Sequence, residues 1–303
     1  MRSVFAAVFA ACLIGVAITA VAQETPAGAV DRLTGTLKTI KDSGVVRIGY
    51  RESSLPFSFL DEARRPAGYS IDLCSAIVED VTDELAAAEL RVAYVPVTPE
   101  TRFALLQSGA IDLECGSTTA NVQRRKLVAF SPVIFITGTK LLVRKDSPVR
   151  SLRDLPGKTV AVTRGTTNAA AVEALSKRQR IDVTFVSGAD HKEAFDVFVS
   201  GKADALANDE VLIYSMLTQT RNRTQYRIAG DFLSYDPYAI AYRKDDPQLA
   251  AVVERTFRRL AESRELVWIY EKWFTKRLPS GVRLDLPMSA QLEESFRGLG
   301  LGE

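Results

Sequence analysis

Short apolar or β-branched segments alternate with segments of helical periodicity along the chain, and this alternation limits the possible folds more than any other feature. Within 70–88, apolar residues recur every three or four positions, which predicts one buried helical stripe made of Ile71, Cys74, Val78, Val81 and Leu85. We expect strands at 45–50, 91–97, 111–115 and 203–207, and further helices at 99–108 and in the C-terminal part. Strands separated by helices predict an α/β fold.

A helix, turn and strand unit occurs twice in the sequence. Its members are Phe103, Ser108, Gly109 and Asp112, which return as Phe195, Ser200, Gly201 and Asp204, each 92 positions later. A second repeat aligns Gly44, Arg51, Ser53 and Ser54 with Gly157, Arg164, Thr166 and Thr167. Short matches also arise by chance, but two matches in the same chain order favour two similar lobes.

The two lobes need connections, and the segments 130–135 and 234–238 have the character of crossings between them. We therefore expect lobe one at 23–135, lobe two inserted at 136–235, and a return to lobe one at 236–303. The C-terminal helix should pack on lobe one through the core residues Phe257, Leu260, Val267, Trp268 and Phe274.

The N-terminal segment has the features of a secretory signal peptide. Arg2 precedes an apolar run from Val4 to Val21, which ends in the small residues before Gln23. A retained membrane anchor is the alternative, since about 18 apolar residues begin to suggest a spanning helix. The small residues favour cleavage after Ala22, and Cys12 lies inside the apolar run, where it fits a lipidation signal poorly.

The charge and the cysteine content limit the possible classes of function further. A formal charge of +2 with 25% charged residues describes a mixed surface and gives no indication of nucleic-acid binding. A single histidine argues against a metal site. Beyond the signal segment only Cys74 and Cys115 remain, and in an exported chain they can pair or stay as two small buried residues.

Arginines and hydroxyl residues gather in the loops that follow the expected strands. The loop from Arg51 to Ser54 follows one strand, and the stretch from Ser117 through Thr119 to Arg124 follows another. Thr98, Pro99 and Glu100 predict the start of the helix that closes at Gly109, which places Arg102 near its N-terminus. Such loops are suited to holding anions.

Seven motifs follow one another in an order typical of a known family. They are GVVRIGYRESS, GYSIDL, IDLECGSTT, AFSP, RGTT, GADH and RKDDP, spread over nearly all of the chain after the signal segment. The chain thus resembles family 3 extracytoplasmic solute-binding proteins, and within them the periplasmic glutamate/aspartate-binding proteins of ABC transporters. The resemblance implies a two-lobed periplasmic-binding-protein fold (type II), with lobe two inserted in lobe one and a ligand cleft between them.

The same resemblance implies the partners and the cellular place. It predicts a monomeric periplasmic protein that binds glutamate or aspartate and delivers it to a permease in the inner membrane. No catalysis, cofactor, metal or nucleic acid is expected.

Individual residues take roles through the family motifs. Arg124 is expected to bind the ligand α-carboxylate with its planar guanidinium, and Ser117 and Thr119 would add hydroxyls to the ammonium and the carboxylate. Thr166 and Thr167, at a helix N-terminus, would add backbone N–H and hydroxyl groups.

The other end of the ligand is expected to meet different residues. Arg51 and Arg102 would reach the side-chain carboxylate, joined by His191 as a neutral donor, since Asp190 looks like the cap of the helix that His191 begins. Asp209 would bind the α-ammonium. Three arginines against one acid would then match a diacid that carries one ammonium.

The chain departs from the family pattern at two positions. Pro99 stands where these binders usually carry a serine, and Ser70 replaces the usual acidic residue after Gly-Tyr. The first change puts one hydrogen bond to the side-chain carboxylate in doubt.

Two other classes use the same scaffold. Periplasmic enzymes such as cyclohexadienyl dehydratases bind carboxylated ligands between similar lobes, and His191 or Glu114 could move a proton in such a reaction. Sensory modules are the other class, but the chain lacks a second membrane segment and a DNA-reading helix pair. A binding protein fits the sequence better than either.

Overall fold

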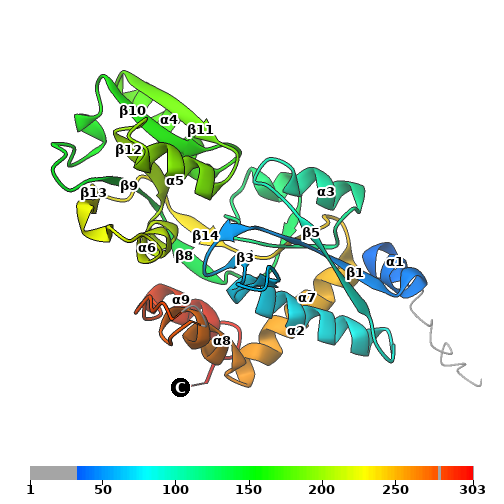
Figure 1. Ribbon diagram of the computed structural model, residues 1–303. Coiled ribbons are helices and arrows are strands. Elements are labelled where there is room, and N and C mark those ends of the chain that lie inside the picture. Colours follow the sequence, from blue (N-terminus) through cyan, green and yellow to red (C-terminus); the bar gives the residue numbers. More distant parts are fainter. Residues whose placement is uncertain (1–32, 279–280, 303) are drawn as a thin grey trace, which may run out of the picture. The chain divides into compact units, whose positions relative to one another are not determined.

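Two five-stranded sheets with the same plan organise residues 33–278 and 281–302, which the computed structural model describes (Figure 1). The first sheet runs in the order β5 (Arg91–Pro96), β1 (Val45–Tyr50), β6 (Leu113–Cys115), β15 (Ala241–Tyr242) and β7 (Ala129–Phe130). The second runs β11 (Val183–Gly188), β10 (Lys158–Thr163), β12 (Ala205–Asp209), β9 (Thr139–Arg144) and β13 (Tyr226–Ala229). In both sheets the first three strands are parallel and the fourth is antiparallel to the third. The predicted α/β fold with two similar lobes is confirmed.

Helices cover both faces of the second sheet. The helices of the structure are α1 (Gly35–Ser43), α2 (Tyr69–Glu84), α3 (Arg102–Ser108), α4 (Thr167–Gln179), α5 (His191–Val199), α6 (Glu210–Thr218), α7 (Pro247–Glu262), α8 (Glu265–Phe274) and α9 (Ala290–Arg297), with short 3₁₀ turns η1 (Arg124–Lys126), η2 (Leu152–Asp154) and η3 (Arg223–Gln225). Val172 of α4 packs with one set of sheet residues, whereas Phe198 of α5 and Ile213 of α6 pack with the set on the opposite face. The apolar side chains of this sheet therefore form two clusters, one on each face.

The sequence repeats correspond to repeated contacts. The Asp112 carboxylate accepts the backbone N–H of Arg47 at 2.8 Å, and the Asp204 carboxylate accepts that of Thr159, also at 2.8 Å. Gly109 and Gly201 both take a positive φ, 76° and 80°, in the turn that ends the preceding helix. The repeats at an offset of 92 residues therefore describe one supersecondary unit built twice.

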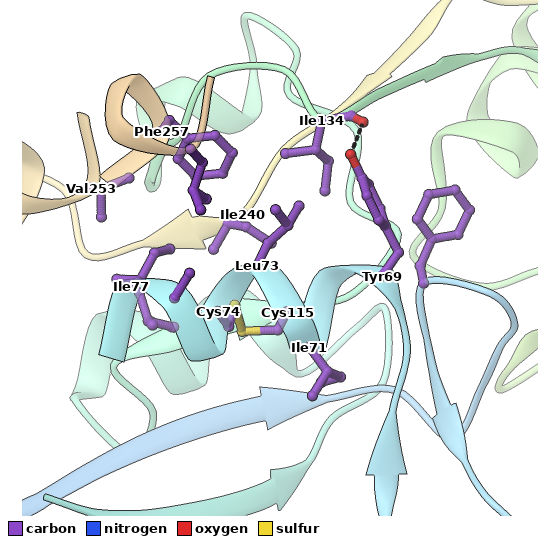
Figure 2. Close-up of a cluster of buried hydrophobic side chains, with 14 of the residues drawn as sticks. Tyr69, Ile71, Leu73, Cys74, Ile77, Cys115, Ile134, Ile240, Val253 and Phe257 are labelled. Carbon is purple, nitrogen blue, oxygen red and sulfur yellow. Dashed lines mark hydrogen bonds between the residues drawn. A yellow bond between two sulfur atoms is a disulfide. The ribbon is translucent and has the colours of Figure 1, made fainter. Parts of the chain in front are cut away.

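The core of the first lobe holds the predicted helical stripe. All five predicted residues are buried, and full burial of a side chain such as Ile71 contributes roughly 1.5–3 kcal/mol. Figure 2 shows this cluster, with the Tyr69 hydroxyl donating to the Ile134 carbonyl at 3.0 Å. Cys74 and Cys115 form a disulfide that joins α2 to the end of β6. Of the two possibilities that the sequence left open, pairing is the one observed.

The Trp268 prediction is wrong. The C-terminal region forms two helices, α7 and α8, separated at Arg264, which has a φ of 65°. The buried residues of α8 include Leu266 and Tyr270, and position 268 lies midway between them, on the opposite side of the helix. Trp268 is accordingly 60% exposed, while Phe257 and Phe274 are buried as predicted.

Helix α3 also begins later than the sequence suggested. The predicted capping hydroxyl of Thr98 accepts the N–H of Thr101 at 3.2 Å, which closes a turn before the helix. The helix itself starts at Arg102, three residues after Pro99, and ends at Ser108 as predicted.

The two sheets are connected through a short antiparallel ribbon of β8 (Phe135–Thr137) and β14 (Asp236–Tyr238). The predicted boundary after 135 falls inside β8 and the one after 235 falls directly before β14, and the division of the chain there stays a prediction. A small sheet of β2 (Ser53–Ser54), β3 (Ser58–Leu60) and β4 (Pro66–Ala67) follows β1. In the described ranges no helix has the length and apolar character needed to cross a membrane. The predicted signal segment, 1–22, lies outside the described residues.

Candidate functional site

The candidate site lies where the parallel strands of both sheets end. Arg51 follows β1, Ser117 and Thr119 follow β6, and Asp209 is the last residue of β12. Beside them, α5 begins with His191. Since ligands of open α/β sheets bind beyond the carboxyl ends of the strands, the topology brings these side chains to one place.

A small cavity lies at this place, lined by residues of both lobes. Eight of the nine predicted site residues line it: Arg102, Ser117, Thr119, Arg124, Thr166, Thr167, His191 and Asp209. Asn168, which the sequence analysis did not single out, lines it too. Arg51 is not among the lining residues. It is 1% exposed. The positive charge of Arg102 lowers the pKa of Arg51, and the charge of Arg51 in turn lowers the pKa of the His191 imidazole.

The two lobes touch directly around this cavity. The hydroxyls of Thr119 and Thr167 lie 3.1 Å apart, and Arg124 Nη2 donates to the Gly165 carbonyl at 3.3 Å. Arg164 pairs with Glu100 at 3.4 Å on the exposed rim. Residues of lobe one therefore close against those of lobe two, which excludes water from the polar groups inside.

The arginines are held by the lobe-one loops. Arg102 Nη1 donates to the Thr118 hydroxyl at 2.7 Å, and Arg124 Nη1 donates to the Thr119 carbonyl at 3.0 Å. Both guanidinium groups lie over the ring of Phe103, at 4.9 and 5.4 Å from its centroid. Burial and the charge of Arg102 lower the pKa of Arg124 to about 9, so it remains a cation at neutral pH.

Several buried polar atoms at the site have no hydrogen-bond partner within the described protein. They are Arg51 Nη1 and Nη2, Arg102 Nε, Ser117 Oγ and Asp209 Oδ1. Leaving a buried polar group unpaired costs about 1–3 kcal/mol, and more for a charged group. The free nitrogens belong to arginines and suit the oxyanions of a ligand, whereas Asp209 Oδ1 can accept from an ammonium.

Asp209 is the acceptor in this set. Its Oδ2 accepts the Tyr238 hydroxyl at 2.5 Å, which leaves Oδ1 available. Burial, then the nearby Asp236, raises the pKa of Asp209 to about 7. An ammonium placed at Oδ1 would favour the ionised form.

The charge balance of the site differs from the prediction of three arginines against one acid. Glu114 and Asp236 are also buried, at 0% and 1% exposure. Asp236 accepts a hydrogen bond from the Thr119 hydroxyl at 3.0 Å. The negative charge of Glu114 acts to raise the pKa values of Arg51, Arg102 and Arg124. Both Glu114 oxygens lack a partner within the described protein. Three acids therefore lie near three arginines. The positions of these groups, rather than the net charge of the site, must determine where the carboxylates and the ammonium of a ligand bind.

His191 is buried and neutral at neutral pH, as predicted. Its pKa lies well below the ordinary value because burial, then Arg51 and Arg102, disfavour the imidazolium ion. The sequence argument rested instead on the helix N-terminus. Asp190 does cap α5, since its carboxylate accepts the Glu193 N–H at 2.9 Å.

The supporting residues were missed for different reasons. Thr118 lies inside the motif IDLECGSTT and Asn208 precedes the predicted Asp209, so their positions were visible but their contacts were not. Asp236 and Tyr238 fall in the predicted crossing, and no local pattern links them to Asp209, 27 and 29 residues earlier. Ser70, the departure noted above, donates to the Gly116 carbonyl at 2.8 Å and so supports the loop that carries Ser117.

Comparison with known proteins gives a consistent family. The chain is 39% identical over 284 residues to the L-glutamate/L-aspartate-binding protein of Pseudomonas aeruginosa, covering 93% of this chain and 94% of that protein. It is 35% identical over 263 residues to the glutamate/aspartate import solute-binding protein of Escherichia coli, covering 86% and 87%. The structure of an ancestral arginine-binding protein bound to glutamine matches with a TM-score of 0.68 and 30% identity, covering 76% and 98%.

The family model for bacterial extracellular solute-binding proteins, family 3, matches residues 46–276. This range includes both sheets except Val45, and every residue of the candidate site. The chain belongs to the family 3 bacterial extracellular solute-binding proteins.

Proposed function

We propose that this protein captures glutamate or aspartate and delivers it to an ABC transporter permease. The observation that carries the proposal is the cavity lined by Arg102, Arg124 and Asp209. Beside it lies Arg51, whose terminal nitrogens have no hydrogen-bond partner among the described residues. A dicarboxylic amino acid offers two oxyanions and one ammonium to these groups. The names of the Pseudomonas and Escherichia relatives support the same ligand class.

In the proposed complex each end of the ligand has its own partners. Arg124, Ser117, Thr119, Thr166 and Thr167 bind the α-carboxylate, Asp209 binds the ammonium, and Arg51, Arg102 and His191 bind the distal carboxylate. Lobe one receives the ligand and hinge rotation brings lobe two over it. The hinge is proposed at the ribbon of β8 and β14, with lobe two at 136–235 inserted in lobe one.

The setting of this activity is also part of the proposal. Cleavage of the signal segment after Ala22 would release a periplasmic protein, which acts as a monomer. Neither a cofactor nor a metal takes part in the binding cycle. The neutral His191 contributes to binding and Glu114 balances the charge of the arginines, and neither transfers a proton to a substrate.

Calorimetric titration of the mature protein with glutamate, aspartate, glutamine and arginine tests the proposal. Glutamate and aspartate should bind tightly and glutamine far more weakly, because an amide leaves Arg51 and Arg102 desolvated without a counter-charge. Tight binding of arginine together with no heat for glutamate would overturn the assignment.

Affinity for glutamate should depend on pH through Asp209. Its pKa of about 7 in the unliganded protein means that below this pH the carboxyl is largely protonated and must lose a proton before it can pair with the ammonium. Affinity is therefore expected to fall by about tenfold for each pH unit below 7 and to level off above about pH 8. Titration in two buffers of different ionisation enthalpy measures the proton released.

The control for this prediction is Asp209→Asn, which keeps the shape of the side chain. It should bind weakly at every pH and release no proton in this range. His191 does not interfere in the native protein, since its pKa lies well below the ordinary value. A native profile that is flat between about pH 6 and 8, with no proton release, contradicts the assigned role of Asp209.

A further inference from the structure

Asn208 contacts the imidazole of His191 but does not line the cavity. It is the penultimate residue of β12 and is completely buried. Its Nδ2 lies 3.2 Å from His191 Nδ1, and the Thr163 hydroxyl lies 3.2 Å from the same ring nitrogen. With Nδ1 engaged by two neighbours, Nε2 is the ring nitrogen left for the cavity that His191 lines.

The orientation of the Asn208 amide is set by the backbone. Its Oδ1 accepts the N–H of Asp209 at 2.9 Å, a bond that the amide nitrogen could not make. The NH₂ group must then face the ring. Because an NH₂ group only donates, His191 Nδ1 has to accept, and the single proton of a neutral imidazole resides on Nε2.

The charged groups around the ring also oppose a second proton. Arg51, after β1, and Arg102, on α3, are both positive and both disfavour the imidazolium ion. Among the nearby acids, Asp190 caps α5 and Asp209 Oδ2 accepts from Tyr238, while the negative charge of Glu114 acts on Arg51 and Arg102. The Thr163 hydroxyl can donate or accept, so it is compatible with either tautomer.

We propose that Asn208 is a positioning residue that holds His191 as its Nε2–H tautomer, so that the ring presents only a hydrogen-bond donor to the ligand. This inference rests on the proposed function. A donor at Nε2 suits a distal carboxylate, whereas the other tautomer would direct a lone pair at that anion. Asn208 thereby favours binding of glutamate over glutamine, although it contacts neither ligand directly.

The test uses the single histidine of the chain. In protein labelled with nitrogen-15 histidine, long-range proton–nitrogen spectra assign the tautomer without overlap. The unliganded native protein should show a protonated Nε2 and an unprotonated Nδ1. In Asn208→Asp, a carboxylate oxygen replaces the NH₂ group, and the proton should move to Nδ1.

Binding provides the second readout. The ratio of glutamate to glutamine affinity should fall by roughly ten- to a hundredfold in Asn208→Asp at about pH 8, because Nε2 then accepts from an amide and repels a carboxylate. The added charge acts equally on the ammonium of both ligands but also repels the distal carboxylate of glutamate, so the fall in the ratio counts only together with the tautomer shift in the spectra. Thr163→Val is the matched control and should change neither the tautomer nor the ratio.

The outcomes separate the possibilities. A native spectrum with the proton on Nδ1 overturns the proposal, even where Asn208→Asp fails to fold. A loss of the Nε2–H tautomer in Thr163→Val, with Asn208 intact, also overturns it. If the native tautomer is Nε2–H but glutamate does not bind, the proposed function fails while the role of Asn208 in fixing the ring stands.

Discussion

Replacing Arg124 with alanine should abolish measurable binding of every amino acid ligand. Its guanidinium reaches across the cavity, from the Thr119 carbonyl in lobe one to the Gly165 carbonyl in lobe two. The substitution removes two charge-assisted hydrogen bonds to the α-carboxylate, each worth roughly 1.5–3 kcal/mol. Calorimetry should show a loss of about a thousandfold or more for glutamate, aspartate and glutamine alike.

Two variants on the same 3₁₀ turn make this prediction specific. Arg125→Ala removes an equal charge from an exposed side chain that lies over Phe130, outside the cavity, and should leave affinity nearly unchanged. Arg124→Lys retains the charge but loses the planar fork, so its affinity should be intermediate. Binding of glutamate by Arg124→Ala within about tenfold of the native protein would refute the role of Arg124.

Much of the fold was predictable because the same short sequence pattern forms the same local structure in both lobes. The offset of 92 residues marks Asp112 and Asp204, which make the same bond to the neighbouring strand in each lobe. Both residues are close in sequence to the turn that positions them. The strand at 45–50 was predicted to the residue for a similar reason, since Gly44 ends α1 with a φ of 66° just before it.

The errors arose where periodicity alone was used to assign a face. Trp268 fits an apolar run, but only tertiary packing decides which side of α8 meets the core. The start of α3 is a similar case, because Thr98 can cap either a helix or the turn that it actually closes with Thr101. Sequence identifies the capping chemistry without fixing the number of residues that follow it.

At the site, the sequence predicted the residues that line the cavity better than those that hold them. Loop motifs carry Ser117, Thr119 and Arg124 on consecutive turns, so recognising one leads to the others. The acid beside Asp209 is Asp236, which comes from the returning crossing and changes the pKa of its neighbour. A contact of this kind depends on how two distant segments pair, and β14 pairs with β8 rather than with anything near Asp209 in sequence.

The distal carboxylate should be recognised mainly through Arg51. Both of its terminal nitrogens are buried without a partner in the described protein, so Arg51→Ala breaks no side-chain hydrogen bond within it. Affinity for glutamate is expected to fall by roughly a hundredfold, while affinity for glutamine changes by only a few-fold. Titration of both ligands into Arg51→Ala measures the loss of preference directly.

Arg102→Ala should also reduce the preference for glutamate over glutamine, but it should lower the stability of the fold as well. That residue donates to Thr118 and lies over Phe103, so its loss also disturbs the loop beneath the ligand. Arg47→Ala is the control for charge, because Arg47 lies on β1, the strand that leads to Arg51, but pairs with the buried Asp112 at 3.8 Å and does not line the cavity. If Arg51→Ala weakened glutamate and glutamine equally, Arg51 would act on a feature that both share, and the distal carboxylate would have to be assigned to Arg102 and His191 alone.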